Sequence, residues 1–173
     1  MDGDQHDVLD QLALSRLVDL YARAIDRLDL VLLRSLYADD AIHDHGAMFR
    51  GGPDAFAEFV GRSMHGMRTH HFMGNRLFVV AGDEAEGETY AVNSHVIDAG
   101  TPQARDYVAG GRYLDRFRRA AHGWRFAYRA RVIDWSQERP HEPGATAGGL
   151  LVGAKAPDDA SYAMLPLLAG IRV

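Results

Sequence analysis

Apolar and polar positions follow two different periods along the chain, and the change falls close to residue 68. Between residues 8 and 27, apolar side chains recur every three or four positions. This spacing predicts one amphipathic helix with a single apolar face, and Asp7 is expected to be its N-cap. The chain is then expected to form a short helix over 29–38, a strand over 41–49 and a helix over 54–63 that begins after Pro53.

The second half of the chain has the pattern of β-strands joined by short connections. Strand-like stretches cover 68–81, 84–98, 104–119 and 123–135, separated by turn-forming residues. Strands joined in this way pair as an antiparallel meander. Helices followed by such a meander predict an α+β fold, in which a curved antiparallel sheet wraps around the N-terminal helices as a cone.

The last part of the chain differs from both halves. Residues 136–173 are rich in Gly, Ala and Pro and carry apolar islands without a clear period. An apolar run such as "YAMLPLLAGI" is costly to expose to water. We therefore expect one domain over 1–135 and a C-terminal extension over 136–173 that packs on the domain or on a neighbouring subunit.

Alternation within the strands predicts which side chains face the interior, because successive side chains of a strand point to opposite faces. In the stretch 84–98, Glu84 and Glu86 share one parity, which is expected to face water. His95 has the other parity and should face inward beside small residues. The same reasoning in the stretch 105–118 places Tyr113 toward the same interior.

The stretch "RTHHFMGNRL", residues 68 to 77, is nearly balanced between its two faces. His70 and His71 are neighbours, so only one of them can face the interior. The parity of His71 is slightly favoured, because Arg76 shares the parity of His70 and prefers water. On this interpretation His70 is the outward partner.

Composition excludes several classes of function. The net charge of −5 comes without any basic block, so nucleic acid is not an expected partner. The absence of cysteine excludes thiolate nucleophiles and Cys-ligated zinc. No apolar run approaches the roughly 20 residues of a membrane span, and no apolar signal core opens the chain, so we expect no membrane partner and a cytoplasmic location.

Metal and nucleotide cofactors find little support in the motifs. The "HDH" stretch at 43–45 puts two histidines on one strand face, which is a chelating arrangement. The glutamate that usually follows such a pair in metal-binding strands is replaced here by Phe49 and Arg50. The chain has no G-x-S-x-G or G-x-G-x-x-G motif. We expect no metal and no cofactor.

Four segments, "LYARAIDRLDL", "HHFMGN", "NSHV" and "GRYLDRFRRAAHGWRF", resemble the SnoaL-like (nuclear-transport-factor-two-like) superfamily over about residues 8–135. They are most similar to its lyase branch of scytalone dehydratase, hexachlorocyclohexane dehydrochlorinase and bile-acid 7α-dehydratase. The resemblance implies a cone-shaped domain and a trimer, with a dimer as the other option for a homo-oligomer. It also implies that Asp26 orients and polarises His71, with His95 and Tyr21 as further catalytic residues.

The resemblance is incomplete at the active-site positions of the family. His45 stands near the position of an active-site tyrosine, and Gly111 and Tyr113 stand where a serine and an asparagine are found. Arg131 is the nearest counterpart of an arginine used by the bile-acid enzyme. His45, Tyr113 and Arg131 are therefore assigned to substrate binding.

These residues predict a cofactor-independent lyase, a dehydratase or dehydrohalogenase. An Asp–His pair would remove a carbon-bound proton from a small, largely apolar substrate, aromatic or polycyclic in type. The alternatives are a ketosteroid-type isomerase or polyketide cyclase on the same scaffold, and a binding protein without catalysis. Each residue also has a structural interpretation: Asp26 as a helix cap, Tyr21 as core packing, and the histidines as core residues with satisfied hydrogen bonds.

Overall fold

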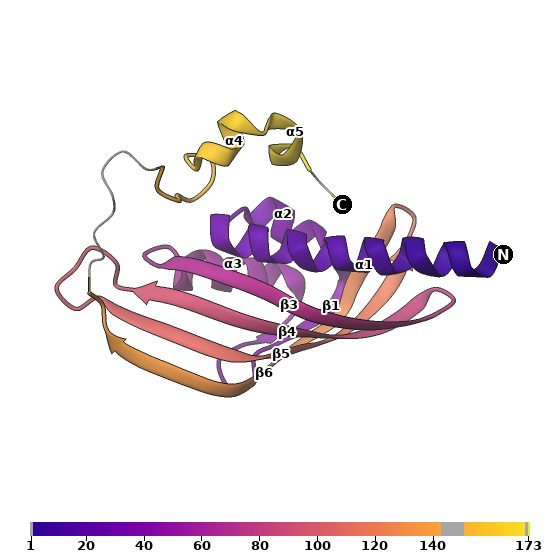
Figure 1. Ribbon diagram of the computed structural model, residues 1–173, viewed down its shortest axis with the longest axis horizontal. Helices are drawn as coiled ribbons and strands as arrows, with labels where there is room; N and C mark the ends of the chain where they lie inside the picture. Colours follow the sequence, from indigo (N-terminus) through magenta and orange to yellow (C-terminus); the bar gives the residue numbers. More distant parts are fainter. Residues whose placement is uncertain (1, 143–150, 172) are drawn as a thin grey trace.

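The computed structural model describes residues 2–142, 151–171 and 173, and side chains from residue 7 onward (Figure 1). A curved sheet lies beneath three helices, and the C-terminal segment covers these helices from above. The elements are α1 (Asp2–Arg27), α2 (Leu30–Ser35), β1 (Tyr37–Asp44), β2 (Arg50–Gly51), α3 (Pro53–Ser63), β3 (Arg68–Ala81), β4 (Glu84–Ile97), β5 (Arg105–Ala120), β6 (Gly123–Pro140), α4 (Ala160–Met164) and α5 (Pro166–Ala169).

The sheet has six strands in the order β2-β1-β6-β5-β4-β3. Strands β3 to β6 form the expected antiparallel meander. The predicted α+β class and the curved sheet around the helices are confirmed. The sheet is mixed, however, because β1 pairs with β6 in parallel. It also remains open, since the edge strands β2 and β3 lie at opposite ends of the strand order.

Helix α1 supplies much of the core. Its buried side chains recur at helical spacing and face the concave side of the sheet: Leu14, Leu17, Val18, Tyr21, Ala24 and Ile25. The helix begins at Asp2, so the prediction of Asp7 as N-cap is wrong. Leu9 and Leu12 are exposed. Gln11 still contacts the sheet, through a hydrogen bond to the Phe78 carbonyl, and at about 100° per residue Leu12 lies on the face of α1 opposite the buried side chains.

Two predicted boundaries are wrong around the second helix. Helix α2 ends at Ser35, and Tyr37 already begins β1, which ends at Asp44 instead of continuing to residue 49. At its start the Asp29 carboxylate caps the helix, accepting a hydrogen bond from the Leu32 backbone N–H at 3.0 Å. Because the helix ends early, Tyr37 belongs to the sheet, and its side chain is buried.

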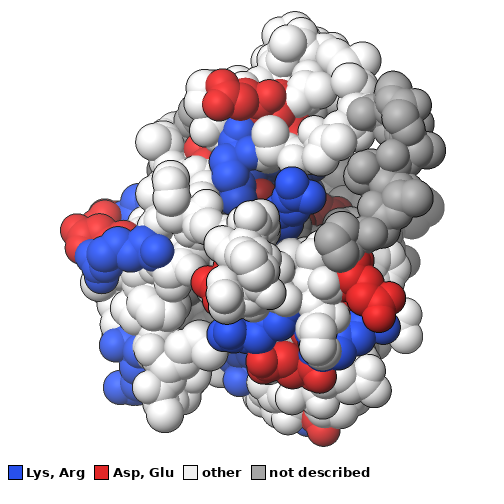
Figure 2. Space-filling model, turned by 90° about the vertical axis from the view of Figure 1, so that its left-hand side faces the viewer, with Lys and Arg blue, Asp and Glu red and all other residues white. Residues whose placement is uncertain are grey.

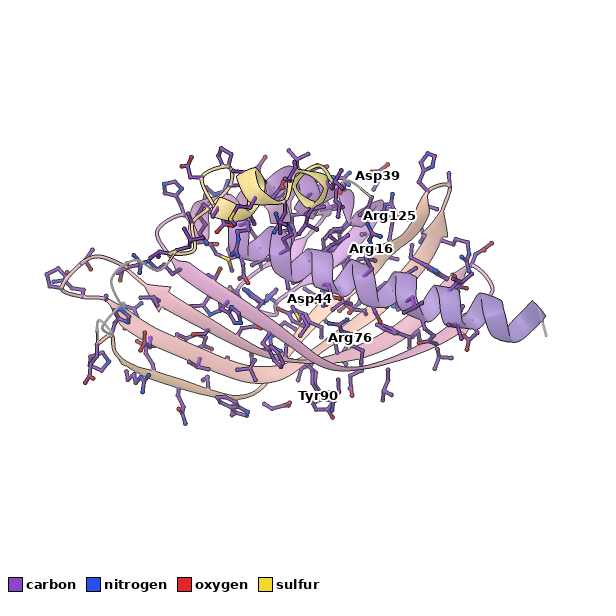
Figure 3. The ribbon with its side chains drawn as sticks, turned by 45° about the horizontal axis from the view of Figure 1, so that its top comes forward. Arg16, Asp39, Asp44, Arg76, Tyr90 and Arg125 are labelled. Atoms are coloured by element: carbon purple, nitrogen blue, oxygen red, sulfur yellow. The ribbon has the colours of Figure 1, made fainter. Side chains whose placement is uncertain are left out.

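A bulge in β3 reverses the faces of this strand. Met73 pairs with Ala91 but Arg76 pairs with Thr89, so β3 holds one extra residue between the two pairs. His71, before the bulge, is 7% exposed and faces the interior. Arg76, after it, also turns toward α1, where it ion-pairs with a helix side chain (Figure 3). The preference of Arg76 for water was therefore an invalid guide to parity.

The described part of the C-terminal segment lies against the end of α1. The backbone N–H of Ala156 donates to the Arg27 carbonyl at 2.7 Å, and Arg27 forms an ion pair with Asp159 at 3.1 Å. The hydroxyl of Tyr162 donates to Asp29 at 3.0 Å. This segment therefore covers the corner between α1 and α2. Strand β6 runs to Pro140, five residues beyond the predicted end at 135.

Candidate active site

A cavity of about 440 Å³ lies between the concave face of the sheet and the helices. Its wall is mostly apolar, with side chains such as Phe56, Phe59, Val60 and Met64 from α3 and the turn that follows it. The polar side chains in the wall are Tyr21, His45, Ser63, His71, Asn93, His95, Tyr107, Tyr113, Arg131 and Glu138. All predicted site residues except Asp26 thus line one cavity.

Asp26 lies directly behind His71. Its Oδ1 is 2.7 Å from His71 Nδ1, and its Oδ2 accepts the backbone N–H of His71 at 3.0 Å. The last turn of α1 supplies the carboxylate, and the first part of β3, before its bulge, supplies the imidazole. Both carboxylate oxygens are therefore used to hold one residue, which fixes the position of the ring.

The charge of Asp26 sets the tautomer of His71. Burial raises the pKa of Asp26, but the hydrogen bonds and charge of His71 outweigh it and leave the pKa below the ordinary value of 3.8. Asp26 is thus a carboxylate at neutral pH and accepts a proton-bearing Nδ1. When the ring carries a single proton, that proton is on Nδ1 and Nε2 bears a lone pair, and His71 lines the cavity.

His95 stands beside His71 on the neighbouring strand. The two rings meet edge to face with centroids 5.3 Å apart. Nδ1 of His95 is buried without a hydrogen-bond partner among the described residues. Burial, followed by the proximity of His71, lowers the pKa of His95 to about 4. The ring is therefore neutral at pH 7 and offers hydrogen bonds, not charge.

Two tyrosines and an asparagine form the floor of the cavity. Asn93 Nδ2 donates to the hydroxyl of Tyr113 at 3.1 Å, while Asn93 Oδ1 has no partner in the described part of the chain. Tyr21 meets Tyr113 edge to face at 5.6 Å. Burial holds the pKa of Tyr21 well above its ordinary value, so its hydroxyl stays protonated. Asn93 shares the inward parity of His95, and this was the signal that could have selected it.

Arg131 brings positive charge to the cavity wall. Its Cζ lies 4.9 Å from the ring centroid of Tyr113, and its Nη2 donates to the Ala109 carbonyl at 3.4 Å. Its Nη1 is buried without a partner in the residues that the structure covers. A buried guanidinium N–H that lacks an acceptor favours a ligand oxygen nearby.

Sequence reasoning missed a buried ion pair beneath the tyrosines. Arg129 Nε lies 3.4 Å from Asp115 Oδ1, and both side chains are fully buried. The guanidinium of Arg129 also stacks on Tyr21 and Tyr113, at 4.0 and 4.1 Å from their centroids. Burial raises the pKa of Asp115 to about 7, against the opposing charge of Arg129. The inward parity that Asp115 shares with Tyr113 could have revealed this pair.

His45 lines the cavity, whereas His43 is buried behind it. The two rings contact each other through ring nitrogens 2.6 Å apart. Their nitrogens thus face one another, whereas a shared metal ion requires them to converge on a common point. The described residues hold no group of three or more His, Cys, Asp or Glu side chains that could bind a metal ion.

The cavity extends to the end of the sheet where β4 ends and β5 begins, since Ile97 and Tyr107 line it there. Figure 2 views the molecule from this end and shows charged side chains of both signs in separate groups with uncharged surface between them. No described helix is long and apolar enough to cross a membrane.

A family model for the SnoaL-like domain matches residues 6–130. No curated protein matches the chain significantly. Among solved structures, a hexachlorocyclohexane dehydrochlorinase (LinA type 2) is 17% identical with a TM-score of 0.72, and the match covers 82% of this chain and 99% of that chain.

Two structures from Novosphingobium aromaticivorans are also similar. A candidate scytalone dehydratase is 20% identical with a TM-score of 0.70, covering 83% of this chain and 99% of that chain. A nuclear-transport-factor-two-like protein with a cystatin-like fold is 22% identical with a TM-score of 0.62, covering 76% of this chain and 86% of that chain. At these identities the structural matches establish the fold alone.

Proposed function

The chain belongs to the SnoaL-like domain family, and on this premise we propose that it is a cofactor-independent lyase that eliminates water or a halide from a small, largely apolar molecule. The observation that carries the proposal is the pairing of Asp26 with His71 at the wall of a mostly apolar cavity. A base held in this way can remove a proton from carbon without a metal ion or an organic cofactor.

In the proposed reaction His71 Nε2 takes a proton from the carbon next to a carbonyl. The electron pair of the C–H bond forms a C=C bond to the carbonyl carbon, and the π electrons of the carbonyl move to its oxygen. When these electrons return to re-form the carbonyl, the C=C bond shifts to the adjacent carbon, and the leaving group departs from that carbon with the electrons of its own bond. If hydroxide leaves, the imidazolium of His71 returns the proton to it, so the products are water and neutral His71. If a halide leaves, it departs as the anion, and the imidazolium releases its proton to solvent. Asp26 stabilises the imidazolium while it exists.

The cavity favours a substrate of one or two rings that carries at least one acceptor oxygen. Its volume of about 440 Å³ lies in the range of sites for drug-sized ligands. The apolar wall from α3 would contact the body of such a molecule. The Nη1 of Arg131, which has no hydrogen-bond partner among the described residues, and the neutral His95 would bind its oxygens.

A panel of aryl β-hydroxyketones and β-chloroketones tests the proposal, with the absorbance of the unsaturated product as readout. We expect His71→Ala to lower kcat/KM by about 10²- to 10⁴-fold. The matched control is His70→Ala, which removes an exposed histidine from the adjacent position on the other face of β3. Equal turnover by the wild type and His71→Ala on every substrate of the panel refutes the proposal.

A ketosteroid-type isomerase or cyclase is the second candidate. The observation in its favour is the low pKa, about 4, of both His45 and His95, which leaves no second imidazolium to protonate a leaving group. An isomerase returns the proton to carbon and needs only the same base. Deuterium incorporation from solvent into a ketone of the panel without release of water or chloride would favour this reaction over elimination.

The convex face of the sheet supports the further proposal of a homo-oligomer, with a trimer favoured. Phe72, Tyr90 and Trp135 are 62%, 50% and 48% exposed, and Figure 3 shows Tyr90 on the side of the sheet away from the helices. An apolar face of this kind marks interfaces between proteins. Light scattering of the wild type and of Trp135→Glu tests it, and we expect the variant to dissociate.

A further inference from the structure

Three side chains form a hydrogen-bonded chain from the core to the cavity. The hydroxyl of Tyr37 lies 2.8 Å from His43 Nδ1, and His43 Nε2 lies 2.6 Å from His45 Nδ1. The His43 and His45 planes are inclined by only 20° with centroids 4.7 Å apart, so the rings meet edge to edge. Phe56 stacks on His43 at 3.4 Å and fixes its plane.

The buried end of the chain sets its direction. Tyr37 is 3% exposed, and burial holds the pKa of its hydroxyl well above the ordinary value, so it keeps its proton. His43 is the only hydrogen-bond partner of this hydroxyl among the described residues. A buried hydroxyl without an acceptor costs about 1–3 kcal/mol. Tyr37 therefore donates to His43 Nδ1.

The proton positions of both histidines follow from this direction. His43 accepts at Nδ1 and is neutral, because burial holds its pKa well below the ordinary value. Its proton is then on Nε2, and it donates to His45 Nδ1. His45 accepts at Nδ1, and burial together with the charge of Arg131 lowers its pKa to about 4. Its single proton is therefore on Nε2.

We propose that His45 is a catalytic hydrogen-bond donor: its Nε2–H, held in place by the positioning residues Tyr37 and His43, binds the substrate oxygen that becomes negative when His71 removes the proton. His45 lines the same cavity as His71, and its Nε2 has no partner within the described chain. The role as donor rests on the proposed function of His71, whereas the Nε2–H tautomer does not.

The two histidines thus present opposite tautomers to the cavity. Asp26 accepts from Nδ1 of His71 and leaves a lone pair at Nε2, while His43 donates to Nδ1 of His45 and leaves an N–H at Nε2. As the C–H electron pair becomes a C=C bond, the π electrons of the carbonyl move to its oxygen. The proton of His45 stays on Nε2 and stabilises this oxygen without being transferred.

Nitrogen-15 NMR of the histidine rings tests the tautomer without any substrate. In the wild type we expect His45 to carry its proton on Nε2 and His71 on Nδ1. Tyr37→Phe should release the constraint, so that the Nδ1–H form of His45 becomes populated. Tyr128→Phe is the matched control, since it removes a hydroxyl bonded to the neighbouring Asp44. An Nδ1–H form of His45 in the wild type overturns the proposal.

Binding of 4-nitrophenolate tests the donor, because its charged oxygen imitates the developing oxyanion. We expect His45→Leu to weaken binding about 10- to 100-fold, as for loss of one hydrogen bond to a charged group. His45→Gln should restore most of the affinity, because its amide N–H reaches the place of Nε2. Thermal melting checks that both variants are folded.

His71→Ala separates this proposal from the proposed function. It removes the base but not the donor, so it should bind the probe within about threefold of the wild type, a difference below about 1 kcal/mol. Equal binding by the wild type and His45→Leu, or no binding to the wild type, overturns the role of His45. Failure of the lyase assay alone leaves the binding result unchanged and refutes only the elimination reaction.

Discussion

Replacing Asp26 with asparagine exchanges one carboxylate oxygen for an amide NH₂ group and should reverse the tautomer of His71. The wild-type carboxylate accepts two hydrogen bonds from His71, at 2.7 Å from the ring and 3.0 Å from the backbone. The amide oxygen of the new side chain can accept from the backbone N–H, which leaves its amide N–H₂ facing Nδ1. His71 then accepts at Nδ1 and carries its proton on Nε2. The base is converted into a donor.

The cost in stability follows from the charge of these hydrogen bonds. A hydrogen bond to a charged group contributes about 1.5–3 kcal/mol and a neutral one about 0.5–1.5 kcal/mol, so two weakened bonds cost about 2–3 kcal/mol. The neutral amide in Asp26→Asn offsets part of this loss, because burial disfavours the charged carboxylate that it replaces. A net loss of about 1–2 kcal/mol corresponds to a Tm lower by about 2–8 °C.

The lowered pKa of Asp26 determines how the stability difference between the wild type and Asp26→Asn changes with pH. The pKa of Asp26 in the folded protein is below its ordinary value of 3.8. Its contribution to stability is therefore complete above the unfolded pKa and disappears as the pH falls through the folded pKa. Circular dichroism melts of the wild type and Asp26→Asn should differ at about pH 7 and converge at low pH.

The test uses one control variant and two measured quantities, the Tm and the tautomer of His71. Asp54→Asn removes an exposed carboxylate that pairs with Arg34 on the surface, and it should change the free energy of unfolding by less than about 1 kcal/mol. Nitrogen-15 NMR reports the tautomer of His71 directly. An Asp26→Asn protein with unchanged Tm at neutral pH and a proton still on Nδ1 of His71 would refute the reasoning.

Three further predictions concern stability. Asp115→Ala leaves Arg129 buried without its counter-charge and should cost about 3–5 kcal/mol in urea unfolding, whereas Asp115→Leu combined with Arg129→Met should recover most of it. Gly111→Ala places a Cβ 2.1 Å from the Val132 carbonyl oxygen and should cost about 1–3 kcal/mol by the same assay. The pKa of His95 in the folded protein is about 4, against an ordinary value of 6.5, so the free energy of unfolding should rise with pH between these two values. His95→Gln should remove up to about 1.4 kcal/mol per pH unit of this slope. An unchanged slope in the variant contradicts the prediction.

Strand parity predicted the inward side chains wherever the pairing is regular. The β4–β5 ladder pairs without a shift from Glu84 to Ile97, and His95 and Tyr113 both lie where alternation places them. In β3 the bulge between Met73 and Arg76 reverses the alternation, and Gly74, a glycine inside a strand pattern, is the residue that could have indicated it. His71 was placed inward by resemblance more than by parity.

The sequence was less informative about hydrogen bonds between side chains, because these depend on ring orientation and on where each helix or strand begins and ends. The spacing of His43 and His45 places both on one strand face, but their 2.6 Å contact depends on the side-chain rotamers. Tyr37 was assigned to the helix over 29–38, which hid its place in the sheet and its contact with His43. The chain of three side chains could therefore not be derived from the pattern of residues.

The distribution of charge explains why His71, among the histidines in and behind the cavity wall, is the ring suited to accept a proton. His43, His45 and His95 all have lowered pKa values because burial disfavours their charged forms. Of these four described rings, only His71 has a carboxylate in direct contact with a ring nitrogen, so an imidazolium there is compensated. A proton taken from a substrate is thus retained at one site, and the surrounding rings remain neutral hydrogen-bonding groups.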